Sequence, residues 1–315
     1  MLPGVKPRPF RFGVQEGRVL SAREWRENAR RIEAMGYAGI YSPDHFDDQL
    51  APVPGLMAAA DATTTLRVGS LVFDNDYRHP VVLAKEAATL DLLSDGRFDL
   101  GIGAGWMASD YRHAGIPYDS AGTRIERMEE ALGIIKSCFA GEKFSFHGKH
   151  YTIEDFEATP LPAQKPHPPI LMGGGGRKML GIAAREADIV HINYNLREGR
   201  INPALVHTGF ADANDEKIAW VKEAAGERFP RIELGLTIFF ANVTEDRGSL
   251  AEAIAPGMQA QAQDILDMPF FLIGTIDELV EQLQARRARY GISFVIVPGD
   301  AAEALAPVVE RLTGN

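Results

Sequence analysis

Short apolar runs that alternate with longer helical stretches are the feature that most constrains the fold of this chain. RFGVQ at residues 11–15 precedes a helical stretch from Ser21 to Met35, and the same rhythm continues to ISFVIV at residues 292–297. We count eight such strand candidates, and strands that alternate with helices are typical of parallel sheets. No linker rich in Pro, Gly or Ser divides the 315 residues. The pattern therefore predicts a single (β/α)8 TIM barrel domain over residues 1–315 rather than a doubly wound open sheet.

Two segments interrupt the rhythm of strands and helices. Residues 141–159 alternate like a β-hairpin, whereas residues 244–269 are polar and lack a strand pattern. We expect both segments to be insertions into the barrel.

The charge and the cysteine count exclude some classes of function. With 33 Lys and Arg against 43 Asp and Glu, the net charge is −10, which disfavours a nucleic-acid partner. No apolar stretch reaches the roughly 18 residues of a membrane span. The single cysteine, Cys138, excludes an intramolecular disulfide and fits a reducing compartment. We expect a cytoplasmic protein in which Cys138 is a buried structural thiol.

Polar residues gather where the predicted strands end, which is where barrels of this kind carry their functional groups. Asp44 and His45 follow the second strand. A histidine can donate or accept a proton near neutral pH, so His45 is our candidate acid/base. His147 and His150 lie in the predicted hairpin without a carboxylate or cysteine set, so we predict no metal site.

Two glycine-rich loops follow other strands. GIGAG at residues 101–105 is not a Rossmann fingerprint because Trp106 occupies the position of its third glycine, so we interpret it as a close approach to a flat ring. MGGGGRK joins a strand to a helix at Gly173–Gly176, and helix N-termini bind anions. This run, with Arg177, predicts a phosphate cradle, and a tight structural turn is the alternative.

Two arginines lie on one face of the helix predicted from about Thr123 to Phe139. Arg124 and Arg127 stand among the acids Glu126, Glu129 and Glu130, which favours salt bridges within the helix. The alternative for Arg124 is contact with an anionic ligand.

In this order, the motifs GYAGIYSPDHF, RHPVVLAKEAATLDLLSDGRFDLGIGAGW, RIERMEEAL and PPILMGGGGRK resemble the bacterial luciferase-like superfamily. Within it they are most similar to the branch of coenzyme F420 (deazaflavin)-dependent oxidoreductases. The resemblance runs from Phe10 to about Val297. It implies a barrel that holds a flavin or deazaflavin at the C-terminal ends of its strands and that pairs as a homodimer.

The resemblance also implies roles for individual residues. His45 would be the acid/base beside the hydride-transferring carbon, Asp44 would lie near the ring, and Ser70-Leu71 would be the site of a non-prolyl cis peptide. Gly103 to Trp106 would line the ring, and the glycine loop with Arg177 would hold the phosphate. The implied cofactor-binding residues are Asp44, Ser70, Leu71, Gly103, Ala104, Gly105, Trp106, Gly173, Gly174, Gly175, Gly176 and Arg177.

The chain departs from the sugar-phosphate dehydrogenases of that branch at two positions. Gln49 stands where they carry a tryptophan, and Trp106 stands where they carry a glutamate general acid. We therefore expect a less polar substrate than a sugar phosphate. The expected reaction is hydride transfer between coenzyme F420 and a small unsaturated, carbonyl or alcohol substrate.

Two other functions remain open at this stage. One is an FMN-dependent two-component monooxygenase supplied by a separate reductase, since the motifs do not separate F420 from FMN. The other is a non-catalytic flavin-binding protein. A metal-dependent barrel hydrolase would need ligands that the strand ends lack.

Overall fold

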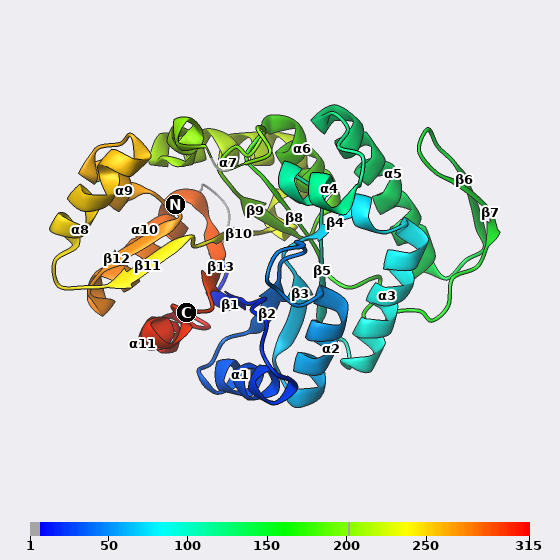
Figure 1. The fold of residues 1–315 in the computed structure, drawn as a ribbon, viewed down its shortest axis with the longest axis horizontal. Coiled ribbons are helices and arrows are strands. Elements are labelled where there is room, and N and C mark those ends of the chain that lie inside the picture. The colour runs from blue at the N-terminus through cyan, green and yellow to red at the C-terminus, as the bar shows by residue number, and fades with distance from the viewer. Residues whose placement is uncertain (1–6, 201) are drawn as a thin grey trace. The chain divides into compact units, whose positions relative to one another are not determined.

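The computed structural model describes residues 7–200 and 202–315. Eight of its strands correspond to the predicted ones: β1 (Arg11–Gln15), β2 (Gly39–Ser42), β3 (Arg67–Ser70), β5 (Phe98–Gly103), β8 (Ile170–Gly174), β9 (Ile189–Ile192), β10 (Glu233–Thr237) and β13 (Ile292–Pro298). Their order in the sheet is β3-β2-β1-β13-β10-β9-β8-β5, and β3 also pairs with β5. This order, with helices between successive strands (Figure 1), is that of the predicted (β/α)8 barrel, and the fold class is confirmed.

Helices occupy most of the chain between these strands. They are α1 (Ala22–Ala34), α2 (Pro52–Ala62), α3 (Pro80–Leu93), α4 (Ala108–Ala114), α5 (Ala121–Ala140), α6 (Arg177–Glu186), α7 (Ala211–Ala225), α8 (Arg247–Ile254), α9 (Ala262–Asp267), α10 (Ile276–Tyr290) and α11 (Ala302–Leu312). Short 3₁₀ helices are η1 (Asn75–Tyr77), η2 (Pro203–Gly209), η3 (Gly226–Arg231) and η4 (Ala255–Met258). In the described part of the chain, no helix has the length and apolarity that crossing a membrane requires.

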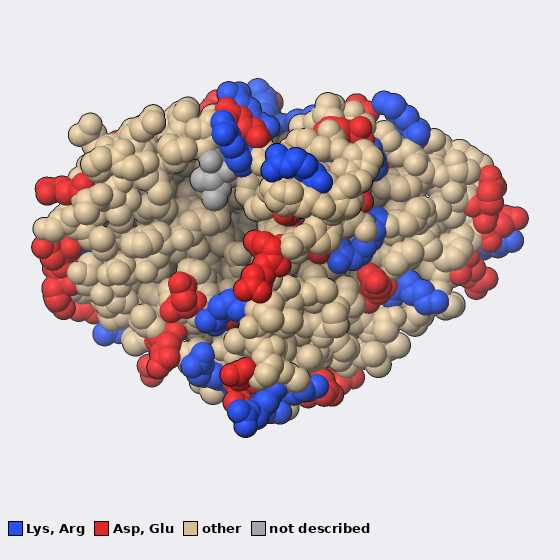
Figure 2. Space-filling model, viewed as in Figure 1, with Lys and Arg blue, Asp and Glu red and all other residues tan. Residues whose placement is uncertain are grey.

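Contacts divide the chain into two compact units, which we describe separately. Unit 1 contains residues 7–16, 31–39, 173–200 and 202–315, and unit 2 contains residues 17–30 and 40–172. On the face shown in Figure 2, acidic and basic side chains lie interspersed among the other residues.

In unit 2, local signals and buried polar contacts fix the helices. Ser21 and Glu24 form a capping box at the start of α1, with Ser21 N 3.0 Å from Glu24 Oε2 and Glu24 N 3.3 Å from Ser21 Oγ. The buried Trp25 indole donates to Gly55 O at 2.8 Å and so ties α1 to α2. Strand β5 is buried along its whole length, as expected for a central parallel strand.

The segment predicted to alternate as a hairpin does so. Strands β6 (Phe144–His147) and β7 (Thr152–Phe156) pair antiparallel, with Phe144 opposite Phe156. Alternate residues of β6 are half-buried and exposed, which matches the alternation seen in the sequence. Its role as an insertion into a single domain stays a prediction.

In unit 1, strands β1, β13, β10 and β9 pair in parallel, with Gly13 opposite Ile296 and Gly235 opposite His191. The core contains Phe12, Val14 and Phe294, each at most 2% exposed. Strands β11 (Phe240–Val243) and β12 (Phe271–Gly274) form a separate parallel pair that we did not predict. Residues 244–269, predicted to lack strands, contain α8, η4 and α9.

Candidate active site

Asp44, two residues after the end of β2 in unit 2, is held by hydrogen bonds from the protein. Its Oδ2 accepts hydrogen bonds from Arg78 Nη1 at 2.5 Å and from the backbone N–H of Asp74 at 3.0 Å. Arg78 Nη2 binds Oδ1 at 3.2 Å, and the side chain of Asp44 is 5% exposed. Bidentate pairing with arginine is a strong charge-assisted contact. Asp44 therefore joins the end of β2 to the segment after β4 (Phe73–Asp74), and its contact with a cofactor stays a prediction.

His45 lies beside a buried carboxylate and an indole. Its Nδ1 is 2.7 Å from Asp110 Oδ2, and the ring of Trp106 meets the imidazole edge-on at a centroid distance of 5.8 Å. The His45 side chain is 21% exposed, whereas that of Asp110 is 6% exposed. An imidazole that is anchored on one side and open to solvent on the other can exchange a proton with a bound molecule.

Behind this pair lies a cluster that we name the Asp–Tyr cluster: Asp74, Asp76, Tyr77, Asp110 and Tyr111. The Tyr111 hydroxyl lies 3.0 Å from both carboxylate oxygens of Asp74 and 3.0 Å from Asp76 Oδ2. The Tyr77 hydroxyl lies 3.4 Å from Asp110 Oδ2, and the tyrosine rings contact each other at 5.5 Å. The cluster connects the segment after β3 to α4.

Burial changes the proton affinities in this cluster. It raises the pKa of Asp74 to about 7, and the nearby negative charges of Asp76 and Asp44 act in the same direction. Hydrogen bonds from Asp76 N–H and Tyr111 oppose that shift of the Asp74 pKa. Burial and the adjacent carboxylates also raise the pKa of Tyr77 and of Tyr111, so both phenols stay protonated donors.

The two arginines of α5 do not form the expected salt bridges within the helix, and that prediction is wrong. Arg127 binds Asp76 at 2.8 Å and also binds Asp119, because both acids lie on the loop side of α5. Arg124 is 5% exposed and donates to the backbone oxygens of Ala104, Gly105 and Asp119. Arg124 therefore anchors the loop after β5, and its contact with an anionic ligand stays a prediction.

The glycines of GIGAG are accounted for by packing against the protein itself. A Cβ on Gly101 would overlap Ser70 O, and one on Gly103 would lie 2.7 Å from Val72 Cγ2. Gly105 has φ +72°, and a Cβ there would overlap the Tyr111 hydroxyl. The predicted ring-lining role of Gly103, Ala104 and Gly105 stays a prediction, while Trp106 lies beside His45.

The cis peptide bond lies one residue later than expected. It joins Leu71 to Val72, not Ser70 to Leu71. The Ser70–Leu71 peptide continues the end of β3, where Leu71 N–H donates to Ser42 O at 2.8 Å. Ser70 is fully buried and its hydroxyl bonds Gly101 O at 2.8 Å, so this residue ties β3 to β5.

The second glycine loop belongs to unit 1 and is described there by itself. A Cβ on Gly173 would lie 3.1 Å from His191 Cβ, one on Gly174 would lie 2.7 Å from Met179 Cγ, and one on Gly175 would overlap Tyr194 O. Packing against the backbone of Tyr194 therefore requires Gly175, and Gly173 and Gly174 fit closely against His191 and Met179. Close packing agrees with the tight structural turn considered above, and the phosphate role of these glycines stays a prediction.

The last glycine of the run, Gly176, faces open space. Nothing lies within 4 Å of a Cβ on Gly176, which is the N-cap of α6 and carries no side-chain cap. The backbone N–H groups of the first turn of α6 are a suitable anion site. Arg177 binds the exposed Glu223 on α7 at 2.9 Å, so its guanidinium is engaged away from this loop.

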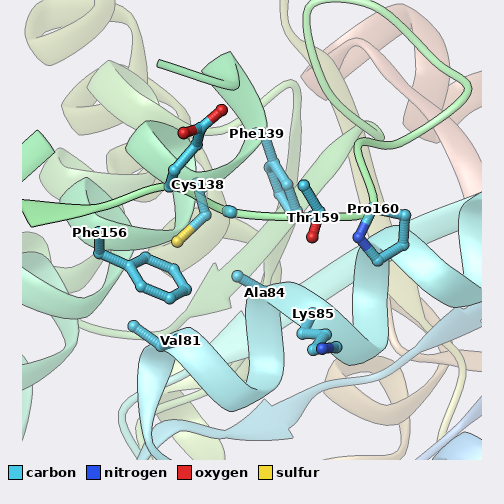
Figure 3. A pocket seen from close by; sticks show the side chains of 10 residues that line it. Val81, Ala84, Lys85, Cys138, Phe139, Phe156, Thr159 and Pro160 are labelled. Carbon is cyan, nitrogen blue, oxygen red and sulfur yellow. The ribbon is translucent and has the colours of Figure 1, made fainter. Parts of the chain in front are cut away.

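A pocket of about 100 Å³ lies elsewhere in unit 2, and Figure 3 shows its lining. Val81, Ala84, Cys138 and Phe156 line it together with Pro160, and none of its lining residues is a predicted site residue. Burial raises the pKa of the Cys138 thiol to about 11. The described residues contain no group of three or more His, Cys, Asp or Glu side chains suited to a metal ion.

Sequence reasoning missed Asp110. It lies 65 residues after His45, in the first turn of α4, and the sequence offered only the position of an acidic residue shortly after a strand end.

A profile of the luciferase-like monooxygenase family matches residues 8–247 of the chain. The FMNH2-dependent dimethylsulfone monooxygenase of Pseudomonas putida is 33% identical over 168 residues, which is 53% of this chain and 45% of that protein. The F420-dependent glucose-6-phosphate dehydrogenase of Microbacterium testaceum is 30% identical over 189 residues, 57% of this chain and 55% of that protein. The chain thus spans about half the length of these relatives.

Solved structures agree on the fold. The coenzyme F420-dependent tetrahydromethanopterin reductase of Methanopyrus kandleri superposes with a TM-score of 0.77 over 97% of this chain and 100% of the other, at 19% identity. The monooxygenase RslO1 of Streptomyces bottropensis gives a TM-score of 0.71 over 96% of this chain and 97% of the other, at 22% identity.

Proposed function

Because this chain belongs to the luciferase-like monooxygenase family, we propose that it is an oxidoreductase that uses coenzyme F420 to transfer a hydride to or from a small organic substrate. The proposed substrate is an unsaturated, carbonyl or alcohol compound. The observation that carries the proposal is the His45–Asp110 pair at the end of a barrel strand, with Nδ1 and Oδ2 2.7 Å apart. The similarity to both an F420-dependent and an FMNH2-dependent enzyme supports the proposal that this chain is an oxidoreductase.

Each unit, taken by itself, carries residues suited to one group of a flavin-like ligand. In unit 2, Leu71, Ala104, Trp106 and Met107 are partly exposed near the strand ends and offer apolar surface to a flat ring. In unit 1, the uncapped start of α6 at Gly176 offers backbone donors to a phosphate. When bound, the deazaflavin would supply the hydride chemistry.

The chain itself would orient the substrate and move one proton. His45 would donate a proton to a substrate atom that gains a hydride, or accept one from an alcohol that loses a hydride. Trp106, edge-on to His45, would exclude water and limit the polarity of the substrate. Arg124 would hold this loop through the carbonyls of Ala104 and Gly105.

The FMN-dependent monooxygenase remains the second candidate, favoured by the 33% identity to an FMNH2-dependent relative. Such an enzyme would require a reductase as partner. The same histidine would then handle a proton in oxygen chemistry.

Equilibrium binding of the purified chain to coenzyme F420 and to FMN, followed by fluorescence, separates the two candidates. We expect F420 to bind at least about tenfold more tightly, a difference of about 1.4 kcal/mol. The opposite preference, together with oxygen consumption on addition of reduced FMN, would replace hydride transfer with monooxygenation.

A further inference from the structure

The contact between His45 and Asp110 fixes which imidazole nitrogen carries a proton. A carboxylate only accepts hydrogen bonds, so at 2.7 Å from Asp110 Oδ2 the Nδ1 of His45 must be the donor. In the neutral ring Nε2 is then the basic nitrogen. Within the described residues, Nε2 has no hydrogen-bond partner in the protein.

Asp110 is held in place from two sides. It lies in the first turn of α4, where the helix dipole favours a negative side chain. Tyr77 donates its hydroxyl to the same Oδ2 at 3.4 Å, and the phenol remains protonated because burial and nearby carboxylates raise its pKa. The side chain of Asp110 is 6% exposed, so water competes weakly for its oxygens.

The other charges around Asp110 are already paired. Asp44 is bound by Arg78 and Asp76 by Arg127. Tyr111 has a single hydroxyl proton for three carboxylate oxygens at 3.0 Å, so a proton on Asp74 would complete that set of hydrogen bonds. Burial raises the pKa of Asp74 to about 7, in line with this donor count.

From this geometry we infer that Asp110 is a positioning residue, which holds His45 as the Nδ1–H tautomer and presents Nε2 as the nitrogen that exchanges a proton with the substrate. The inference rests on the proposed acid/base role of His45. Tyr77 supports it by restricting the Asp110 carboxylate. A displacement of a catalytic group by about 1 Å can lower the rate about 100-fold. A carboxylate that holds the histidine ring in one orientation therefore preserves the rate of proton transfer.

The test measures the tautomer of His45 by NMR of the ring nitrogens in protein labelled with ¹⁵N-histidine, without cofactor. The His45 signals among the 8 histidines are those lost in His45→Asn. In Asp110→Ala the neutral ring is expected to shift toward the Nε2–H form, while the wild type shows Nδ1–H. If Asp110→Ala does not fold, Asp110→Asn, which keeps the side-chain volume, takes its place. In Asp110→Asn the side-chain amide is expected to donate to Nδ1 of His45, which again favours the Nε2–H form.

A matched control tests whether any buried aspartate would have the same effect. Asp91 is fully buried and accepts hydrogen bonds from Gln164 at 2.9 and 2.6 Å. We expect Asp91→Asn to leave the tautomer unchanged and kcat within about threefold. The Asp110 variants should lower kcat about 100-fold with KM nearly constant.

The outcomes separate this inference from the proposed function. An unchanged tautomer in the Asp110 variants, or an equal loss of kcat in Asp91→Asn, overturns the positioning role. If the tautomer shifts as expected but F420 does not bind, the role of Asp110 stands and the proposed cofactor is wrong.

Discussion

His45 in unit 2 and His191 in unit 1 differ in exposure and in hydrogen bonding, although one follows a parallel strand and the other lies within one. His45 follows β2, pairs with Asp110 and is 21% exposed. His191 lies within β9, is 5% exposed, and neither of its ring nitrogens has a hydrogen-bond partner in the described chain. Burial and the positive charge of Arg11 lower the pKa of His191 to about 3. A histidine after a strand can exchange a proton, whereas one within a strand serves as a neutral packing group.

The surroundings of His191 show how an unpaired imidazole is accommodated. Its ring meets Phe294 edge-on at a centroid distance of 5.2 Å. Gly235, directly opposite on β10, leaves space for the ring, and a Cβ there would lie 2.6 Å from His191 Cδ2. Apolar and aromatic contacts therefore hold this ring, with no charged partner to make it reactive.

The largest expected difference follows from making the same substitution at both histidines. In His45→Asn the amide can still donate to Asp110, so stability should change by less than about 1 kcal/mol while kcat falls about 10²- to 10⁴-fold. In His191→Asn the lost ring contacts and the buried amide should lower the free energy of unfolding by about 2–4 kcal/mol. Urea unfolding and steady-state kinetics measure both effects. The comparison breaks down if His191→Asn loses activity at full stability, or if His45→Asn keeps its turnover.

The pH dependence of stability should have opposite signs in the two regions. The folded pKa of His191, about 3, lies below its ordinary value of 6.5, so the unfolded chain binds more protons and stability falls as pH drops below 6.5 toward 3. The folded pKa of Asp74, about 7, lies above its ordinary value of 3.8. The Asp74 contribution is therefore fully present below pH 3.8 and is lost as pH rises through 7.

Each contribution changes by up to about 1.4 kcal/mol per pH unit within its window. Urea unfolding of the wild type, His191→Asn and Asp74→Asn between pH 4 and 8 isolates them. His191→Asn should remove the loss of stability on the acid side, and Asp74→Asn should remove the loss toward neutral pH. Parallel pH curves for the wild type and either variant would show that the corresponding group does not titrate in the folded protein as described.

Two glycines of unit 1 provide a smaller test. Gly235→Ala should lower the free energy of unfolding by about 1–3 kcal/mol, because the new methyl group would press on His191 and on Phe294 O at 2.8 Å. Gly176→Ala should change it by less than about 0.5 kcal/mol, since nothing lies within 4 Å. Thermal unfolding of the two variants gives the difference. Equal effects would mean that the space for the His191 ring is not set by Gly235.

Most of the fold could be predicted from the sequence because its signals are local. The bounds of β1 agree with the predicted residues 11–15, and α6 begins directly after the glycine run, as the sequence indicates. The four-residue strands β11 and β12 were missed because their pairing joins residues about thirty positions apart. Short apolar runs of that length carry no periodic signal.

The candidate site was less predictable than the fold. The position of His45 at a strand end pointed to it, but its partner Asp110 is 65 residues away and only the folded chain brings them together. The glycines suggested ligand contact, yet Gly101 and Gly173 have packing reasons that depend on Ser70 and His191. A glycine looks the same in sequence whether a ligand or another part of the backbone requires the space.

Arg124 has a consequence for exchanging parts between related barrels. It lies on α5 but binds carbonyl oxygens at Ala104, Gly105 and Asp119, and its guanidinium stacks 4.2 Å over the ring of Tyr118. The loop after β5 and the first turn of α5 must therefore be exchanged together. A chimera that transplants residues 104–119 keeps the loop conformation only when its helix supplies an arginine at position 124. Recombination points belong within β5 and after that first turn.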